Sequence, residues 1–145
     1  MDKLTDFHGA KVALFADDDL LVYRRDDIPE IPFPNMIDLP GGGRENGESG
    51  TECVIRETRE EFGITLEPGA LKLAEEYENW RGSGAGALFY VGALSSAQVE
   101  AIDFGDEGQH WSLMPVSEFV ASEEAVPHLK QRVQIWMETE SHDFR

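Results

Sequence analysis

The sequence predicts a single domain over residues 1–145 with a mixed α/β (α+β) sandwich fold. Short segments rich in strand-forming residues are separated by two helical patterns, which is typical of helices packed on a sheet. The length of 145 residues suits one sizeable core and does not suffice for two independent ones. The sequence shows no internal repeat, low-complexity tract or linker. A single compact domain is therefore expected.

The first part of the chain is expected to form a β-hairpin. Residues 11–16 and 20–25 are rich in strand formers and flank a turn of three aspartates. The following ten residues contain three prolines, which predicts an irregular loop, and residues 36–39 allow only a short strand. Three glycines at 41–43 then permit a sharp turn, because glycine adopts backbone angles that other residues rarely adopt.

A helix is expected from about Ser49 or Thr51 to Phe62, with Gly63 at the place of a C-terminal glycine stop. The helical period puts apolar and acidic residues on different faces. The face predicted to pack carries Ile55, Thr58 and Phe62, with Val54 at its edge, and the other carries Glu57, Glu60 and Glu61. One face of this helix should therefore contact the core while the other presents carboxylates.

The second half of the chain predicts another hairpin and a C-terminal helix. In order, the expected elements are a strand at 71–78, a flexible loop at 79–86, a strand at 87–94, a short helix at 96–102, an acidic loop at 103–109, a strand at 110–116, a helical turn at 117–121 and a helix at 128–140. Ser117 is expected to cap the helical turn. The last helix carries Leu129, Val133, Trp136 and Met137 on one side, as a helix docked on the body would.

Charge and cysteine content exclude some classes of partner. The chain has 12 Lys and Arg against 29 Asp and Glu, a formal net charge of -17, which argues against nucleic acid and anionic membranes as partners. Cys53 is the single cysteine, so no internal disulfide forms, which fits a reducing compartment. No signal peptide pattern or long apolar run is visible. A soluble, cytoplasmic protein is expected.

Three glutamates on one helical face indicate a cation. Glu57, Glu60 and Glu61 stand at i, i+3 and i+4, where like charges repel one another. Carboxylate oxygens suit Mg²⁺ or Mn²⁺, and Mg²⁺ usually shares its remaining sites with water and substrate phosphates. Such an ion neutralises phosphate charge and activates a water molecule for attack on phosphorus. The pattern therefore favours metal-assisted phosphate chemistry.

Residues 42–64 also match the pattern G-x5-E-x7-R-E-U-x-E-E-x-G-U, where U is apolar or similar. The fixed positions are Gly42, Glu48, Arg56, Glu57, Glu60, Glu61 and Gly63, and the U positions are Thr58 and Ile64. A glycine turn or a charged helix alone is most often an ordinary solvated feature, for example with an i,i+4 pair of Glu52 and Arg56. Their combination at this spacing favours a functional site. The pattern resembles the Nudix box.

Resemblance to Nudix hydrolases implies a fold and a reaction. The implied fold is the α/β/α Nudix sandwich with a mixed β-sheet. The implied function is a Mg²⁺-dependent pyrophosphohydrolase, with Mn²⁺ as a substitute, that cleaves a nucleoside diphosphate linked to another moiety by water attack on phosphorus. A small nucleotide or related diphosphate is the expected substrate, and homodimers are common among such proteins.

The resemblance also implies a set of metal ligands. These are Glu57, Glu60 and Glu61, with the Gly41 carbonyl as a further ligand. A further acidic residue often comes from a loop outside the box. Glu107 is the candidate here, with Asp106 and Asp103 as alternatives in the same loop. A solvated acidic loop is an equally good explanation of that segment.

Supporting and catalytic roles follow from the same resemblance. Glu48 and Arg56 are expected to support the ligands, with the guanidinium bracing nearby carboxylates. The general base is expected to be Glu61 or Glu57. The expected catalytic set is Glu48, Arg56, Glu57, Glu60 and Glu61.

Candidate substrate-binding residues lie outside the box. Arg25 is similar in placement to arginines that contact substrate phosphate in some Nudix hydrolases, and Arg24 should point the opposite way because strand residues alternate. Trp80 and Arg81, in a hairpin loop, suit stacking on a base or pairing with phosphate. Packing is the expected role of Trp111, Trp136 and Cys53. The four histidines show no metal-binding spacing.

Two other functions remain open. A non-catalytic nucleotide-sensing module could keep the same fold, although intact carboxylates and the lack of an attached partner domain weigh against it. Isomerisation of an isoprenyl diphosphate uses a cysteine and an acid at positions that this chain does not visibly supply. The downstream proline and tyrosine that mark some Nudix subgroups do not transfer either, because the corresponding region contains Asn79, Trp80 and an earlier Tyr77.

Overall fold

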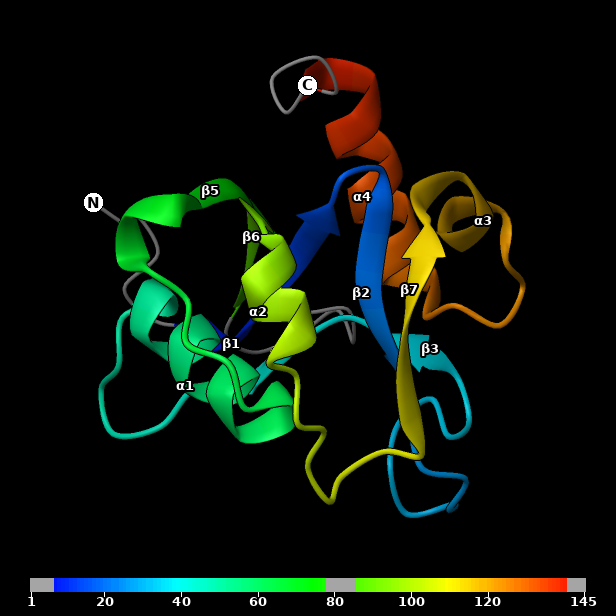
Figure 1. The fold of residues 1–145 in the computed structure, drawn as a ribbon. Coiled ribbons are helices and arrows are strands. Elements are labelled where there is room, and N and C mark those ends of the chain that lie inside the picture. The colour runs from blue at the N-terminus through cyan, green and yellow to red at the C-terminus, as the bar shows by residue number, and fades with distance from the viewer. Residues whose placement is uncertain (1–6, 78–85, 141–145) are drawn as a thin grey trace.

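Strand β1 (Phe7–Ala16) shows how this chain builds two apolar cores, because strand side chains alternate between the faces of a sheet. Val12 and Leu14 join one cluster of buried residues, whereas Ala13 and Phe15 join another. The computed structural model describes residues 7–77 and 86–140. It places helices on both faces of the sheet, as Figure 1 shows, which confirms the predicted α/β/α sandwich.

Seven strands in the described ranges form one mixed sheet. After β1 they are β2 (Asp19–Arg24), β3 (Ile37–Asp38), β4 (Gly41–Gly43), β5 (Leu71–Tyr77), β6 (Gly86–Ala93) and β7 (His110–Pro115). The central order is β3-β2-β1-β6-β5, while β4 pairs with β1 and β7 pairs with β2. Strands β1 and β6 are parallel, and the other pairings of these strands are antiparallel. Both predicted hairpins, β1–β2 and β5–β6, are present.

The helices divide between the two faces of the sheet. They are α1 (Gly50–Phe62), the short 3₁₀ helix η1 (Pro68–Ala70), α2 (Ser96–Glu100), α3 (Val116–Ala121) and α4 (Pro127–Glu140). Residues of α1 and α2 contact one apolar cluster, and residues of α3 and α4 contact the other (Figure 1). In α4, Leu129, Val133 and Trp136 are buried, as the sequence predicts.

Helix α1 begins and ends where the sequence predicts, because both ends carry strong local signals. Ser49 accepts a hydrogen bond from the Glu52 N–H, and the Glu52 side chain accepts one from the Ser49 N–H, which makes a capping box. Gly63 ends the helix with a φ of 69°, in the left-handed region. Glu52 therefore acts in the cap, rather than as the partner of Arg56.

Four details differ from expectation. Strand β1 begins at Phe7, four residues before the predicted start at residue 11. Residues 41–43 form strand β4 along β1 instead of a simple turn, with Gly41 at a φ of 127°. Ser117 does not cap α3, because this helix begins one residue earlier, after Pro115, whose fixed φ suits the position before a helix. On α1, Ile55 is half-buried, whereas Cys53 and Val54 are fully buried. The packed face of α1 is therefore rotated toward β4.

The remaining expectations about packing hold in the described ranges. Trp136 is buried and Trp111 packs against the other cluster, so both tryptophans have packing roles. None of the helices in the described ranges is long and apolar enough to cross a membrane. Trp80, Arg81 and most of the expected loop at 79–86 lie outside the described residues.

Candidate active site

Strand β4 lies directly against the acidic face of α1. The Gly41 N–H donates a hydrogen bond to Glu61 Oε1 at 3.0 Å, and a Cβ on Gly42 would lie 2.6 Å from Glu57 Cδ. Glycine at position 42 therefore lets the backbone approach the carboxylate closely. Cys53 Sγ lies 3.6 Å from the Gly42 carbonyl oxygen, and burial raises the pKa of this thiol to about 11. Cys53 is a packed thiol beneath the strand rather than a nucleophile.

Arg56 links helix α1 to the segment that precedes it. Its Nε and Nη2 donate to the two carboxylate oxygens of Glu48 at 2.6 and 3.1 Å, and Nη2 also donates to the Gly43 carbonyl at 2.7 Å. Its Nη1 donates to Glu57 and Glu60, both at 3.1 Å. Hydrogen bonding to Arg56 holds the pKa of Glu48 below its usual range. The guanidinium thus fixes carboxylates on two segments at once.

The three glutamates of α1 have different environments. Glu57 is 16% exposed in its side chain, whereas Glu60 is 57% exposed and is held by Arg56. Burial raises the pKa of Glu61 to about 8, against the opposing effects of Lys11 and the Gly41 N–H. Burial also raises the pKa of Glu57, although Arg56 favours its ionised form. Glu57 and Glu61 face β4, and Glu60 does not join them.

Asp38, which sequence reasoning missed, organises the cationic groups beside β4. This carboxylate is buried, with 2% of the residue exposed. Its Oδ2 accepts hydrogen bonds from Lys11 Nζ at 3.0 Å, Arg25 Nη1 at 2.7 Å and the Tyr23 hydroxyl at 3.0 Å, and Oδ1 accepts one from the Leu39 N–H at 2.7 Å. Burial disfavours ionisation of Asp38, but Lys11 and Arg25 outweigh it and hold its pKa below the usual range. One anion therefore positions two cations.

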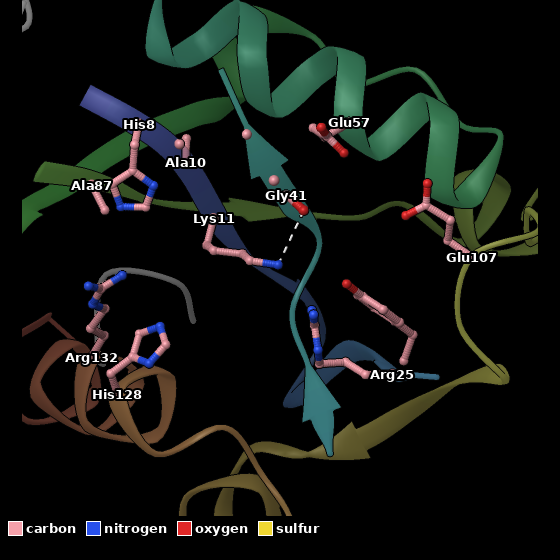
Figure 2. A pocket seen from close by; sticks show the side chains of 14 residues that line it. His8, Ala10, Lys11, Arg25, Gly41, Glu57, Ala87, Glu107, His128 and Arg132 are labelled. Atoms are coloured by element: carbon pink, nitrogen blue, oxygen red, sulfur yellow. Dashed lines mark hydrogen bonds between the residues drawn. The ribbon is translucent and has the colours of Figure 1, made fainter. Parts of the chain in front are cut away.

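Lys11, Arg25, Glu57 and the glycines of β4 border a cavity of about 320 Å³. Figure 2 shows Glu57 and Glu107 on one side of it, Arg132 and His128 from α4 on the opposite side, and Lys11 between them. Glu107, the expected metal ligand from a loop, and Arg25, the expected phosphate-binding residue, both line the cavity, whereas Asp103 and Asp106 are not among its lining residues. Arg24 points elsewhere and pairs with Glu124 at 2.7 Å, which agrees with the expected alternation of the two arginines.

The expected metal ligands are not all gathered at one point in the structure. In the described ranges, no three His, Cys, Asp or Glu side chains are grouped so that they could hold a metal ion together. The Gly41 carbonyl, an expected ligand, accepts a hydrogen bond from Lys11 Nζ at 3.2 Å. The carboxylates that meet the backbone of β4 are those of Glu57 and Glu61.

Several lining residues are missed by sequence reasoning. The sequence pattern assigns Lys11 only to a strand, and it gives His8, His128 and Arg132 no role at the site. For Lys11 the available signal is a lone cation inside an otherwise apolar strand. For His128 and Arg132 it is their i,i+4 spacing, which puts both on one face of α4.

Comparison with known families decides the membership of this chain. The model of the NUDIX domain matches residues 7–134, which include the glycine strand, the acidic helix and most of α4. The chain belongs to the NUDIX domain family. Membership confirms the resemblance inferred from the box and the expected class of enzyme, a Nudix-type hydrolase of diphosphate bonds.

Solved structures similar to this Nudix chain support the fold. A MutT protein from Methanosarcina mazei Go1 aligns with a TM-score of 0.74 at 18% identity, over 95% of this chain and 97% of that one. An Ap4A hydrolase from C. elegans aligns with a TM-score of 0.65 at 16% identity, over 92% and 98%. These identities are low, so the likeness concerns the Nudix fold alone.

A third similar structure belongs to a longer protein. It is a bifunctional NMN adenylyltransferase/ADP ribose pyrophosphatase from Francisella tularensis, complexed with AMP and a Mn ion. The TM-score is 0.71 at 17% identity, over 92% of this Nudix chain and 41% of that protein. The present chain thus spans less than half the length of that relative. Comparison of the sequence with curated proteins gives no match.

Proposed function

We propose that this chain is a Mg²⁺-dependent Nudix pyrophosphohydrolase that cleaves a nucleoside diphosphate linked to another moiety by water attack on phosphorus, with Mn²⁺ as a substitute ion. The observation that carries the proposal is the contact of Gly41 and Gly42 with Glu61 and Glu57. It joins a backbone segment to two largely buried carboxylates, and both the segment and Glu57 line a cavity that suits a small molecule.

The donor atoms fit a hard cation. Glu57 and Glu61 are one helical turn apart on the face of α1 that meets β4, and the nearby backbone carbonyls also offer oxygen. Mg²⁺ is commonly held by one or two carboxylates, with substrate phosphates and water as its other ligands. A site with two carboxylates therefore suits Mg²⁺, whereas a complete protein cage is not needed. When bound, the ion would neutralise charge on the diphosphate and make the attacking water more acidic.

The residues of the chain then take distinct roles. Glu61 or Glu57 accepts the proton of the attacking water as general base. Arg56 and Glu48 hold these carboxylates in place through the hydrogen bonds described above. Glu107, on the same side of the cavity as Glu57, is proposed as a further metal ligand. Glu60 is proposed as a more distant supporting group, which shares the guanidinium of Arg56 with Glu57.

Two cations are proposed to bind substrate phosphate. Lys11 and Arg25 line the cavity, and both are held by the single buried carboxylate of Asp38. Because one anion cannot neutralise two cations, a net positive charge is left for phosphate oxygens. This arrangement also resolves the apparent conflict between an acidic chain and an anionic substrate, since the net charge of -17 is not spread evenly around the cavity.

The similar structures support a nucleotide-type substrate. One of them is named as an ADP ribose pyrophosphatase and has AMP and a Mn ion bound, and another is named as an Ap4A hydrolase. Both names refer to nucleotides, which is the class of substrate proposed here. A cytoplasmic location is proposed as well, because the lone cysteine, Cys53, is buried and reduced.

The proposal is tested by incubating the purified chain with Mg²⁺ and a panel of nucleoside triphosphates, nucleotide sugars, dinucleoside polyphosphates and ADP-ribose. Products are identified by ³¹P NMR in ¹⁸O-labelled water, which shows which phosphorus is attacked. We expect hydrolysis of at least one compound, and a loss of at least about 100-fold in Glu57→Gln and Glu61→Gln. Glu100→Gln, at an exposed position on α2, is the matched control and should retain full activity.

Failure of the whole panel would contradict the proposed reaction. If nucleotides then raised the melting temperature without turnover in Mg²⁺ or Mn²⁺, the non-catalytic sensing module would be favoured instead. Retained activity in both glutamine variants would mean that the chain catalyses the reaction at a site other than this one.

A further inference from the structure

The cavity has a second end, whose cation is Arg132, that the proposed reaction does not use. It is formed by Arg132 and His128, one helical turn apart on α4, and it lies across the cavity from Glu57 (Figure 2). Helix α4 docks through Leu129, Val133 and Trp136, and the pair at 128 and 132 lies on the adjacent side of the same packed helix. This end of the cavity is therefore a fixed wall.

Arg132 is buried without an acid. Only 5% of the residue is exposed, and its guanidinium carbon lies 4.3 Å from the centre of the Tyr77 ring. Within the described part of the chain, no ion pair or hydrogen bond of its side chain is found. Arg25, which also lines the cavity, and Arg56, on α1, are instead held by the carboxylates of Asp38 and Glu48.

This environment is costly for a charge that has no partner. Burial lowers the pKa of Arg132, and the Tyr77 ring is the neighbour that opposes this effect. The charge of a buried arginine is normally matched by a carboxylate or phosphate, and removal of such a partner is strongly unfavourable. The five N–H donors of Arg132 therefore need acceptors that a ring face cannot provide.

Stacking on Tyr77 also fixes how the donors are presented. A guanidinium that lies against a ring keeps its donors at the edge of its plane, and that edge offers paired N–H groups. Paired donors match the two oxygens of a carboxylate or of a phosphate. Since Arg132 lines the cavity, such a ligand group would enter from the cavity side.

We propose that Arg132 binds a negatively charged oxygen group, a phosphate or a carboxylate, that the substrate carries in addition to the diphosphate at Glu57. This assignment rests on the proposed function insofar as the bound molecule is the substrate. It narrows the substrate class to diphosphates with a third anionic group, such as a further phosphate or an acidic sugar. A neutral moiety would leave the buried guanidinium unpaired.

The test compares equilibrium binding of matched ligands by calorimetry in the presence of EDTA, so that no turnover occurs. UDP-glucuronate and UDP-glucose differ by one carboxylate, and ATP and ADP differ by one phosphate. We expect the wild-type chain to bind the more anionic member of at least one pair about tenfold more tightly, because a bidentate arginine contact is lost in the other. A preference in the sugar pair identifies a carboxylate, and a preference in the nucleotide pair identifies a phosphate.

Variants assign the preference to Arg132. Arg132→Met keeps an apolar stem over Tyr77 and should abolish the preference, and Arg132→Lys, which keeps the charge but loses the paired donors, should reduce it. Lys130→Met, two residues away on the same helix and outside the lining of the cavity, is the matched control and should keep it. Circular dichroism checks that each variant is folded.

Several outcomes would overturn the inference. One is that the wild-type chain shows no preference, or no measurable binding, with either pair of ligands. This result requires no variant. Another is a preference that survives in Arg132→Met or that is lost equally in Lys130→Met. A shared loss of affinity for both members of a pair would instead assign Arg132 to a group that both members carry, such as the diphosphate or the base, and would also contradict the proposal. If the chain hydrolyses a compound of the panel but shows no Arg132-dependent preference for the more anionic ligand, this inference alone is refuted. If the preference is found but no compound is hydrolysed, the proposed reaction alone is refuted.

Discussion

Arg56 holds both carboxylate oxygens of Glu48, with its Nε 2.6 Å from Oε2 and its Nη2 3.1 Å from Oε1. The side chains of both residues are largely buried, with 16% and 15% exposed. The pair joins the segment before α1 to the middle of that helix. Because Arg56 also reaches Glu57, the position of a proposed metal ligand depends on a residue that is not itself a proposed ligand.

Weakening this pair should reduce activity without unfolding the chain. We expect Glu48→Gln and Arg56→Lys each to lower kcat/KM by about 10-fold to 100-fold, as found for residues that orient metal ligands. The double variant should lose little more than Arg56→Lys alone, because both changes remove the same bidentate contact. Arg59→Lys, at an exposed position on the same helix, is the control. Fully additive losses would show that the two residues act separately.

Thr58 occupies an apolar position of the box at a cost in stability. The residue is fully buried, and its hydroxyl has no hydrogen-bond partner in the described structure. Thr58→Val replaces the hydroxyl with a methyl group of similar size, so we expect the free energy of unfolding to rise by about 1 kcal/mol. Urea denaturation measures this change, and Thr65→Val, at an exposed position, should change stability by less than about 0.5 kcal/mol. A lower free energy of unfolding in Thr58→Val would contradict the claim that the Thr58 hydroxyl is unsatisfied.

Much of the fold is predictable because its signals are local. The capping box at Ser49, the stop at Gly63 and the alternation in β1 each lie within a few residues, and the structure has all three. The prediction of Ser117 as a cap is wrong because Pro115 already sets the start of α3. Local pattern misleads where a neighbouring residue imposes the backbone conformation.

The site is less predictable because its cationic side is assembled from distant segments. Lys11 and Asp38 are 27 positions apart and meet only when β1 and β3 enter the same sheet. Helical spacing places Glu57, Glu60 and Glu61 together, but it does not show that Arg56 holds the exposed Glu60. The helical period of α4 predicts its docked side, whereas the role of Arg132 depends on Tyr77 in another element.

Asp38 should dominate the stability of the cationic side of the cavity. Asp38→Asn leaves the half-buried Lys11 and Arg25 without their anion, so we expect a loss of about 3 kcal/mol at pH 7 in urea denaturation. The folded-state pKa of Asp38 lies below its ordinary value of 3.8. Its contribution is therefore fully present above that pH and is lost as pH falls through the folded-state pKa. The difference between wild type and variant should shrink below pH 3.8, unlike that of the exposed control Asp27→Asn. A difference in stability between wild type and Asp38→Asn that does not change with pH would contradict this link between the charge of Asp38 and stability.

His128 should make the folded chain sensitive to mild acid. Burial, reinforced by Arg132, lowers the pKa of His128 from 6.5 to about 4, so between these values the unfolded chain binds more protons than the folded one. Stability should therefore fall by about 1–2 kcal/mol from pH 7 to pH 4, after allowance for partial exposure. His128→Phe keeps a ring beside Phe33, whose ring centre lies 5.5 Å from that of His128, and should flatten this acid limb. The exposed control His110→Asn should keep the fall in stability between pH 7 and pH 4. The same fall in His128→Phe would contradict the assignment.

The most direct test of the proposed site is the binding of Mn²⁺ to the substrate-free chain, followed by electron paramagnetic resonance. The ion is expected between β4 and the carboxylates of Glu57 and Glu61. We predict saturable binding of one ion, with Kd raised at least about 10-fold in Glu57→Gln and in Glu61→Gln and unchanged in Glu100→Gln. Equal affinity in the wild-type chain and both glutamine variants would contradict the assignment of these carboxylates to the metal.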